Sequence, residues 1–128
     1  MISDIKVALK AKQCTTERGL ALLDAIEIVS GKWKMIIICV LKNDQLRFKD
    51  LQKLIPKITP RMLSKELKEL EANGVIKRAV HDTIPVIIEY SINEHAKELV
   101  DIILNLVQWG VKHRNYIKEV KYASLKTN

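Results

Sequence analysis

Residues 58–74 read ITPRMLSKELKELEANG and carry signals for the beginning, the inner face and the end of one helix. Thr59 is a preferred N-cap residue, and Pro60 fits the first helical position, where its missing N–H costs no hydrogen bond. Asn73 and Gly74 tolerate the positive φ at which helices commonly stop. At about 100° per residue, one narrow arc of this helix, which we expect to face a core, collects Leu63, Leu67 and Leu70.

The opposite side of the same predicted helix is basic. Arg61, Lys65 and Lys68 fall within about 60° of one another, as a surface that neutralises DNA phosphates requires. A solvated outer face gives the same pattern, and Glu69 beside the stripe weakens the basic signal. The charge distribution favours the DNA interpretation, because residues 47–78 hold nine Lys/Arg and four acids, which is +5 of the net charge of +7.

The residues after this helix predict a hairpin and a long final helix. Residues 75–80 are rich in β-branched side chains and residues 86–92 alternate with a period of two, so both segments predict strands. Their connection has its tip around residues 82–83. The last helix is expected to start after Asn93 and to continue to about Tyr116 or beyond.

The residues before it predict helices only. A short helix is expected within the first twelve residues, and a second helix begins near Thr16 and ends at Gly31. Residues 32–42 are apolar almost all round, so we expect this helix to be buried on every face. Residues 47–55 form a shorter helix. A short helix, a turn, a second helix and a hairpin make a winged helix-turn-helix, so the fold class is α+β and mainly helical.

Composition limits the class of protein. A chain of 128 residues fits one domain, residues 1–128, and 48% hydrophobic with 29% charged residues is typical of a globular protein. A net charge of +7 attracts nucleic acid or an anionic membrane surface. No apolar run approaches the roughly 18 residues of a membrane span, and no secretory signal is visible. Cys14 and Cys39 form no disulfide framework, so we expect a cytoplasmic location.

The sequence shows no constellation typical of catalysis or metal binding. His81, His95 and His113 are scattered, without ligand spacing or a paired nucleophile. It contains no Gly-rich phosphate loop, no Ser–His or Cys–His arrangement and no close carboxylate pair. We therefore expect no enzyme activity, no metal and no other cofactor. Cys39, within the apolar helix, is interpreted as a small core residue.

The apolar face of the last helix is wider than one small domain can cover, which favours a partner helix from a second copy. Burial on the chain's own core is the alternative. We expect dimerisation helices over about residues 16–30 and 93–120. Their predicted contacts are Leu22, Ile26, Leu99, Ile102, Ile103, Leu106 and Trp109. For Trp33 and Trp109 packing is favoured over the lining of a ligand pocket.

Motifs spread over residues 14–114 occur in a characteristic order. They are Gly31-Lys32-Trp33, Arg47-Phe48-x-x-Leu51, Ile58-Thr59-Pro60-Arg61-Met62-Leu63, Leu67-x-x-Leu70-Glu71-x-x-Gly74, Pro85 with Glu89-Tyr90-Ser91, and Trp109-Gly110. Together they resemble the HxlR-type regulators, a branch of the MarR-like winged-helix proteins. The resemblance implies a dimeric bacterial transcription regulator on a pseudo-palindromic operator. Such regulators commonly control genes for detoxifying electrophiles, aldehydes or oxidants.

The resemblance also implies a sensor role for Cys14, which lies just before the first helix of the family pattern. Neighbouring basic residues and a helix start are surroundings that favour a reactive thiolate, and an inert, half-exposed cysteine is the alternative. Three residues depart from the usual ones: Thr15 replaces a proline, His81 replaces an aromatic residue, and Asn93, which we still expect to cap the last helix, replaces a threonine.

We therefore predict a homodimeric transcription regulator that binds double-stranded DNA at an inverted repeat, with no membrane partner and a small electrophile or oxidant as effector. The DNA-binding region spans about residues 46–92. Its predicted contacts are Lys49, Thr59, Arg61, Ser64, Lys65, Lys68, Lys77, Arg78 and His81. Arg61 is the best candidate for reading a base, and in the wing we favour Arg78 and the tip, not Lys77, as the contacts. The alternative is a winged helix that binds protein and no DNA.

Overall fold

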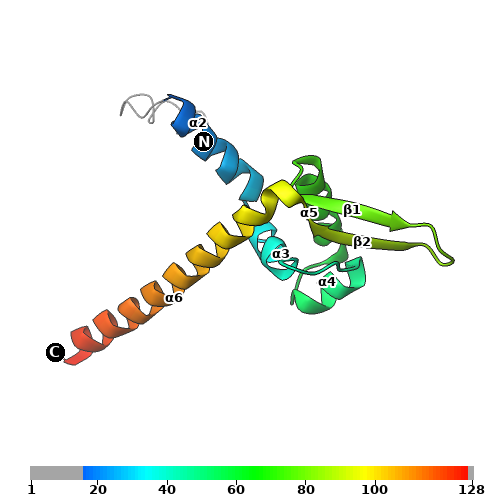
Figure 1. Cartoon of the computed structure of the whole chain (residues 1–128). Coiled ribbons are helices and arrows are strands. Elements are labelled where there is room, and N and C mark those ends of the chain that lie inside the picture. Colours follow the sequence, from blue (N-terminus) through cyan, green and yellow to red (C-terminus); the bar gives the residue numbers. More distant parts are fainter. Residues whose placement is uncertain (1–15, 127–128) are drawn as a thin grey trace.

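The computed structural model describes residues 16–126, and its elements follow the order of a winged helix-turn-helix (Figure 1). The predicted first short helix and Cys14 lie outside these residues. The elements are α2 (Thr16–Val29), α3 (Lys34–Val40), α4 (Phe48–Leu54), α5 (Pro60–Ala72), β1 (Ile76–His81), β2 (Ile87–Ile92), the 3-10 helix η1 (Glu94–Ala96) and α6 (Lys97–Lys126). The predicted fold class is confirmed.

Local sequence signals set both ends of α5. The Thr59 hydroxyl accepts a hydrogen bond from the Met62 N–H at 3.1 Å, and Pro60 occupies the first turn. The helix ends at Ala72, and Gly74 follows with φ +73°. The inner face predicted for this helix is confirmed, because three leucines are at most 2% exposed: Leu63, Leu67 and Leu70.

The hairpin is antiparallel and pairs Ile76 with Ile92 at its base. The Leu46 N–H donates to the Tyr90 carbonyl at 3.0 Å, and the Tyr90 N–H donates to the Leu46 carbonyl at 2.7 Å. Strand β2 is therefore held on both edges at Tyr90, next to the start of α4. The hairpin projects from the helical body as a wing, with its tip in residues 82–86 (Figure 1).

Asn93 joins the hairpin to α5 and does not cap the following helix. It occupies the N-cap position of η1, but its side chain makes no capping hydrogen bond, so the predicted cap is wrong. Instead, Asn93 Nδ2 donates to the Gly74 carbonyl at 3.0 Å, and the Asn93 N–H donates to the Val75 carbonyl at 2.9 Å. The end of β2 is thereby tied to the end of α5.

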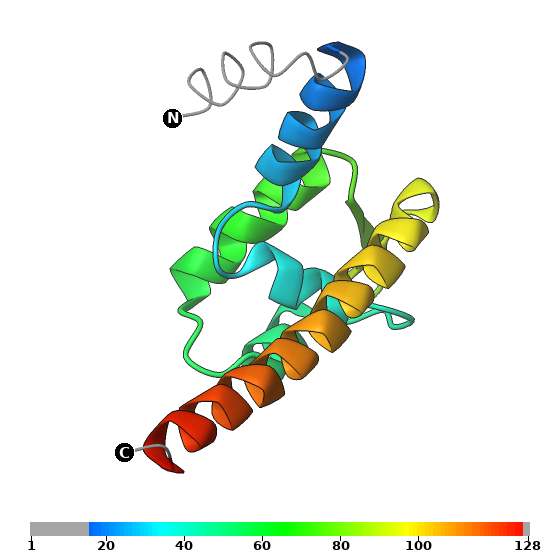
Figure 2. The same ribbon diagram turned by 90° about the vertical axis from the view of Figure 1, so that its left-hand side faces the viewer.

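The core lies where α3, α4, α5, the base of the hairpin and the first turns of α6 meet. Its largest fully buried side chains are Ile37, Ile38, Leu41, Leu51, Ile55, Leu63, Leu67, Leu70 and Ile76. Helix α3 lies between α5 and α6 (Figure 2). A change in the position of α3 would therefore alter the packing of both of these helices.

Helix α3 is shorter and less buried than predicted. Ile37 and Ile38 are fully buried, but Ile36 is 39% exposed, so the expectation of burial on every face is wrong. Cys39 is only half-buried and lines a surface groove between α3 and α6 instead of lying inside the core. The reason is geometric, because α6 crosses α3 and covers only part of its outer side.

Helices α2 and α6 extend away from the core (Figures 1 and 2). Val100 and Ile103 of α6 are buried, whereas every described side chain from Val111 onward is exposed. In α2, Leu23 is buried while its neighbour Leu22 is 55% exposed. Within residues 16–126 no helix has the length and hydrophobicity that crossing a membrane requires.

Candidate nucleic-acid interface

The outward face of α5 is basic, as the sequence predicted. Arg61, Lys65 and Lys68 are all exposed, on the side of the helix that faces away from the core leucines. Ser64, another predicted contact, is half-buried on the flank of the helix. Thr59 is exposed and uses its hydroxyl oxygen for the helix cap, which leaves the hydroxyl hydrogen for another acceptor.

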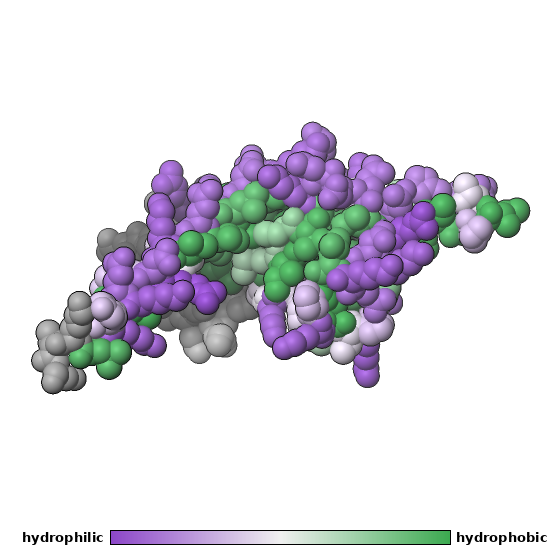
Figure 3. Space-filling model, turned by 90° about the horizontal axis from the view of Figure 1, so that it is seen from below, coloured by the Kyte–Doolittle hydropathy of each residue, from purple (hydrophilic) through white to green (hydrophobic). Residues whose placement is uncertain are grey.

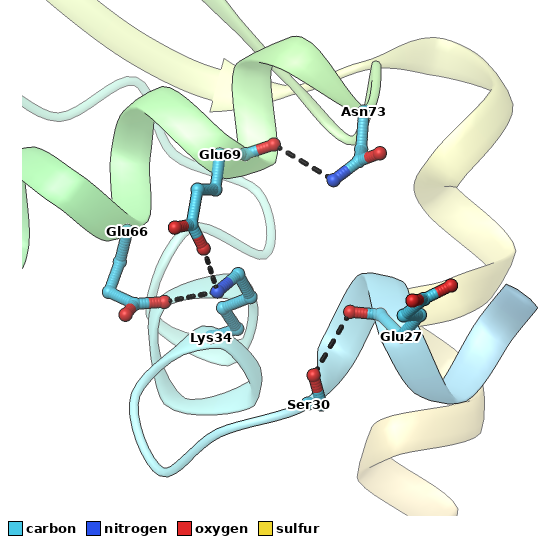
Figure 4. Close-up of polar contacts among 6 residues, drawn as sticks. All are labelled: Glu27, Ser30, Lys34, Glu66, Glu69 and Asn73. Atoms are coloured by element: carbon cyan, nitrogen blue, oxygen red, sulfur yellow. Dashed lines mark hydrogen bonds and ion pairs between the residues drawn. The ribbon is translucent and has the colours of Figure 1, made fainter. Parts of the chain in front are cut away.

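One flank of α5, between the core leucines and the basic face, carries an ion triad in which Lys34 and Glu66 are buried and Glu69 is partly exposed (Figure 4). Lys34 Nζ lies 2.6 Å from a carboxylate oxygen of Glu66 and also donates to the carboxylate of Glu69. The side chains of Lys34 and Glu66 are only 8% and 12% exposed. Burial by itself would lower the pKa of the Lys34 ammonium, but the hydrogen bonds and charges of both carboxylates outweigh it and raise that pKa. In turn, Lys34 lowers the pKa of the Glu69 carboxyl.

This triad changes the charge that α5 presents to its surroundings. The helix carries three basic and three acidic residues, so its own formal charge is zero. Because Glu66 and Glu69 bind Lys34, two of the acids are neutralised in part and held at the inner edge. The outward surface keeps the three basic side chains and the exposed Glu71. Glu69 therefore reduces the positive charge of the outward face less than the sequence indicated.

Helix α4 and the turn after it add further basic side chains beside α5. Lys49, which was predicted to contact DNA, is exposed, as is Lys53. The Arg47 N–H donates to the Asp50 carboxylate at 3.1 Å, which fixes the start of α4. In the turn, the exposed Lys57 adopts φ +70°, a left-handed conformation that is uncommon outside glycine.

The two basic residues at the base of the wing point to opposite faces of the hairpin. Arg78 is paired with Tyr90 and Lys77 with Ser91, so alternate faces of the sheet carry them. Lys77 lines a shallow polar depression of about 210 Å³ together with Glu94 and other residues. The pKa of the Glu94 carboxyl is lowered by its hydrogen bond and ion pair with Lys97 and further by the charge of Lys77.

The end of the wing combines one ion pair with exposed apolar side chains. His81, a predicted contact near the tip, is 46% exposed and lies 2.7 Å from the Glu89 carboxylate. Ile84 and Val86 in the tip are exposed. A contact between His81 and a phosphate would therefore compete with the contact between His81 and Glu89.

Five of the residues predicted to contact a partner chain are exposed: Leu22, Ile26, Ile102, Leu106 and Trp109. Leu99 is half-buried, and Ile103 is only 5% exposed and belongs to the chain's own core. The groove between α3 and α6 has a volume of about 320 Å³ and is lined by apolar residues, among them Met35, Ile36 and Val107. Figure 3 shows hydrophobic side chains uncovered over the middle of the molecule.

The two tryptophans have different surroundings. Trp33 is 9% exposed in the core, with the Lys32 ammonium 4.7 Å from its ring centroid. Trp109 is 60% exposed and stacks on His113, with the ring centroids 4.9 Å apart. The predicted packing role therefore holds for Trp33 and not, within this chain, for Trp109.

Lys34 is the functional candidate that the sequence reasoning missed. It lies within residues 32–42, whose pattern is apolar almost all round. A charge within such a segment needs a partner of opposite sign once it is buried. Glu66 and Glu69, three residues apart beside the core leucines of α5, offered that partner, and this combination was the available signal.

Comparisons with known proteins agree with this architecture. Residues 28–118 match the family described as HxlR-like helix-turn-helix. YtcD of Bacillus subtilis (strain 168), named as an uncharacterised HTH-type transcriptional regulator, is 40% identical over 92 residues, or 72% of this chain and 73% of that protein. The redox regulator HypR in its reduced form superposes with a TM-score of 0.72 at 32% identity, over 77% of this chain and 98% of HypR.

A protein assigned to the MarR family of transcriptional regulators, from Enterococcus faecalis V583, also superposes with a TM-score of 0.72. It is 26% identical, over 82% of this chain and 96% of that structure. The family match covers far more than half of the chain, and its relatives are named as regulators, not as enzymes. The chain belongs to the HxlR-like helix-turn-helix family of transcriptional regulators.

Proposed function

We propose that this chain binds an inverted-repeat operator as a homodimer and that modification of Cys14 controls the binding. The observation that carries the DNA-binding proposal is the outward face of α5. There Arg61, Lys65 and Lys68 are exposed together, while the core leucines hold the opposite side and the Lys34 triad lies on the flank between the two. A capped helix with this distribution of charge is what the major groove of DNA accepts.

The side chains divide into base-reading and phosphate-binding groups. Arg61 stands in the first turn of α5, and the N-terminal residues of a recognition helix are those that meet base edges. Its planar guanidinium suits the two acceptors of guanine. Lys65 and Lys68, on the same face, and Lys49 of α4 supply charge to the phosphates, which fixes the position of the protein without reading sequence.

The wing contributes contacts to the flanking DNA backbone. Arg78 stands on the face of the hairpin that carries Ile76 and Ile92, whose side chains are buried in the core against the helices. It is therefore on the side of the hairpin nearer to the helix-turn-helix. Lys77 lies on the other face, beside Glu94, whose charge competes with phosphate for it. We infer that Arg78 is the stronger contact.

The dimer proposal rests on the apolar surface of α6. Exposed side chains and the stacked His113 follow one another at alternating spacings of four and three residues: Ile102, Leu106, Trp109, His113, Tyr116 and Val120. This spacing is typical of a helix that packs along another helix. Leu22 and Ile26 of α2 are exposed as well. A two-fold dimer would place two recognition helices about 34–36 Å apart, one turn of DNA.

Binding measurements on selected DNA and on unrelated DNA test the assignment of roles. Arg61→Ala should weaken binding to the selected sequence by about 1–3 kcal/mol and relax preference at one base position. Lys68→Ala, the matched change on the same face, should weaken binding to both DNAs and reduce the salt slope by about one. If Arg61→Ala weakened both DNAs equally, Arg61 would be a phosphate contact.

The switching proposal concerns Cys14, which lies outside the described residues. It precedes the first residue of α2 by two positions, and α2 is one of the proposed dimerisation helices. HypR, which this chain resembles, is named as a redox regulator. Bulk added to Cys14 would therefore lie near the dimer contact and change the spacing of the two recognition helices.

Treatment with diamide or an aldehyde tests the switch. Wild-type protein should release its DNA, and Cys14→Ser should retain it. Cys39→Ser is the matched control and should respond like wild type, because burial raises the pKa of the Cys39 thiol and keeps it protonated. Equal release by wild type and Cys14→Ser would exclude Cys14 as the sensor.

A winged helix that binds protein and no DNA is the alternative function. Its recognition helix would not need three exposed basic residues on one face. A complex with DNA whose affinity falls steeply with salt would exclude this alternative, and the absence of such a complex would support it.

A further inference from the structure

Lys34 is a buried charge on the flank of α5, between the core and the face that meets DNA in the proposed complex. Among residues 16–126, Lys34 and Glu66 are the charged residues that are buried, with 7% and 9% exposure. Burying an ion pair costs desolvation energy, so such a pair is weak evidence for stability. The use of buried polar groups that is best supported is to fix one arrangement of the elements that they join.

The triad holds α5 at two points along its length. Glu66 and Glu69 are three residues apart, and both carboxylates bind the same ammonium (Figure 4). A rotation of α5 about its axis would have to break or stretch these bonds. With side chains the helix has a radius of about 5–6 Å, so a rotation of about 10° moves a side-chain tip by about 1 Å. Base contacts tolerate less than this, because hydrogen bonds require about 2.7–3.2 Å.

Lys34 also connects α5 to the other side of the molecule. It is the first residue of α3, and its side chain reaches α5. The opposite side of α3 lines the apolar groove with α6, through Ile36 and Cys39 among others. Helix α3 therefore lies between the proposed dimerisation helix and the recognition helix (Figure 2).

We propose that Lys34 is a positioning residue for operator recognition, which fixes the rotation of α5 by binding Glu66 and Glu69 and so determines sequence specificity without touching DNA. This proposal rests on the proposed DNA binding. Removal of the Lys34 ammonium lets α5 rotate, so the contacts with base edges, which depend on precise geometry, are lost. The attraction of the basic face for phosphates remains, because it depends on charge and less on orientation.

Three variants separate positioning from stability and from charge. Lys34→Met removes the ammonium and leaves two carboxylates facing each other, which can destabilise the fold. The triple variant Lys34→Met/Glu66→Gln/Glu69→Gln removes all three charges, so no unpaired ion stays buried. Lys32→Met removes a neighbouring exposed lysine and is the matched control for charge. The measured quantity is the ratio of affinities for selected and unrelated DNA at one salt concentration.

The ratio should fall about tenfold or more in both Lys34 variants, the size of effect expected for one lost base contact. The triple variant should still bind unrelated DNA at least as tightly as wild type, because the net charge of its triad rises from −1 to zero. Lys32→Met should keep the wild-type ratio. A triple variant that folds and keeps the wild-type ratio would overturn the proposal.

Residual dipolar couplings of the backbone amides in the DNA-free protein give a second readout, which does not depend on DNA binding. The orientation of α5 relative to α4 should change in the triple variant and stay unchanged in Lys32→Met. If wild type prefers no DNA sequence, the proposed function fails, and these couplings still test positioning. Unchanged α5 couplings in the triple variant would overturn the role of Lys34 even if wild type binds its operator.

Discussion

Replacement of Trp109 by alanine should weaken the proposed dimer while the fold of each chain stays intact. Trp109 is 60% exposed in the single chain, so its removal leaves no cavity in the core. A buried aromatic side chain covers up to about 250 Å². Dimerisation would thus remove roughly 150 Å² per copy from water, worth about 4 kcal/mol at 25 cal/mol per Å². Truncation of an interface hot spot, a class in which tryptophan is enriched, costs at least about 2 kcal/mol, so we expect about 2–4 kcal/mol per copy.

Both copies of a homodimer carry the substitution, so the expected loss is about 4–8 kcal/mol, or at least about 1,000-fold in the dissociation constant. Sedimentation velocity over a dilution series measures this shift. Val111→Ala is the control, since Val111 is 55% exposed two residues further along but lies about 160° away from Trp109 around the helix. It should change association by less than about 0.5 kcal/mol.

Two results would exclude the proposed interface along α6. If Trp109→Ala dimerises like wild type, the exposed stripe of α6 is not the interface. If Val111→Ala weakens the dimer as much as Trp109→Ala, α6 contributes through another face and the spacing argument fails.

Further predictions concern the helix cap, the wing and pH. Thr59→Ala removes the acceptor of the Met62 N–H and should lower the free energy of unfolding by about 1 kcal/mol in urea titrations. Arg78→Ala should weaken operator binding and change the footprint more than Lys77→Ala; the reverse order would place the other face of the hairpin on DNA. Glu69 has a folded-state pKa below its ordinary value of 4.5, so the stability it contributes is present above pH 4.5 and is lost as pH falls through the folded value. Glu69→Gln should therefore show a smaller loss of unfolding free energy on acidification. An unchanged loss would show that the ion pair of Glu69 with Lys34 does not contribute to stability.

Features set by residues close together in sequence were predictable. The cap at Thr59, the left-handed Gly74 and the leucine face of α5 depend on contacts within the helix and on a spacing of 3.6 residues. The hairpin follows from the alternation along residues 86–92 and from its short connection. The exposed basic face of α5 follows from the same spacing as the buried leucines.

Features that depend on distant partners were not predictable in this way. Lys34 binds carboxylates 32 and 35 residues away, so the sequence near it gives no sign of them. Asn93 donates to a carbonyl 19 residues earlier, although its residue type favours a cap. The open side of α3 depends on how α6 crosses it, and periodicity does not determine the angle between two helices.

The same limit applies to the candidate site. The wheel of α5 identified Arg61 and its basic neighbours, but which face of the wing carries Lys77 required the register of the strands and the position of Glu94. Likewise, Ile103 belongs to the apolar arc of α6, and only the packing of the helix showed that it is buried within its own chain.

Selection of DNA from the source genome with the purified protein, followed by hydroxyl-radical footprinting, tests whether a homodimer binds an operator. Our expectation is one enriched inverted repeat, protected at two half-sites whose centres lie about 34–36 Å apart, with an affinity that falls steeply as salt rises. Enrichment of no sequence, or protection of a single half-site by a monomer, would contradict it.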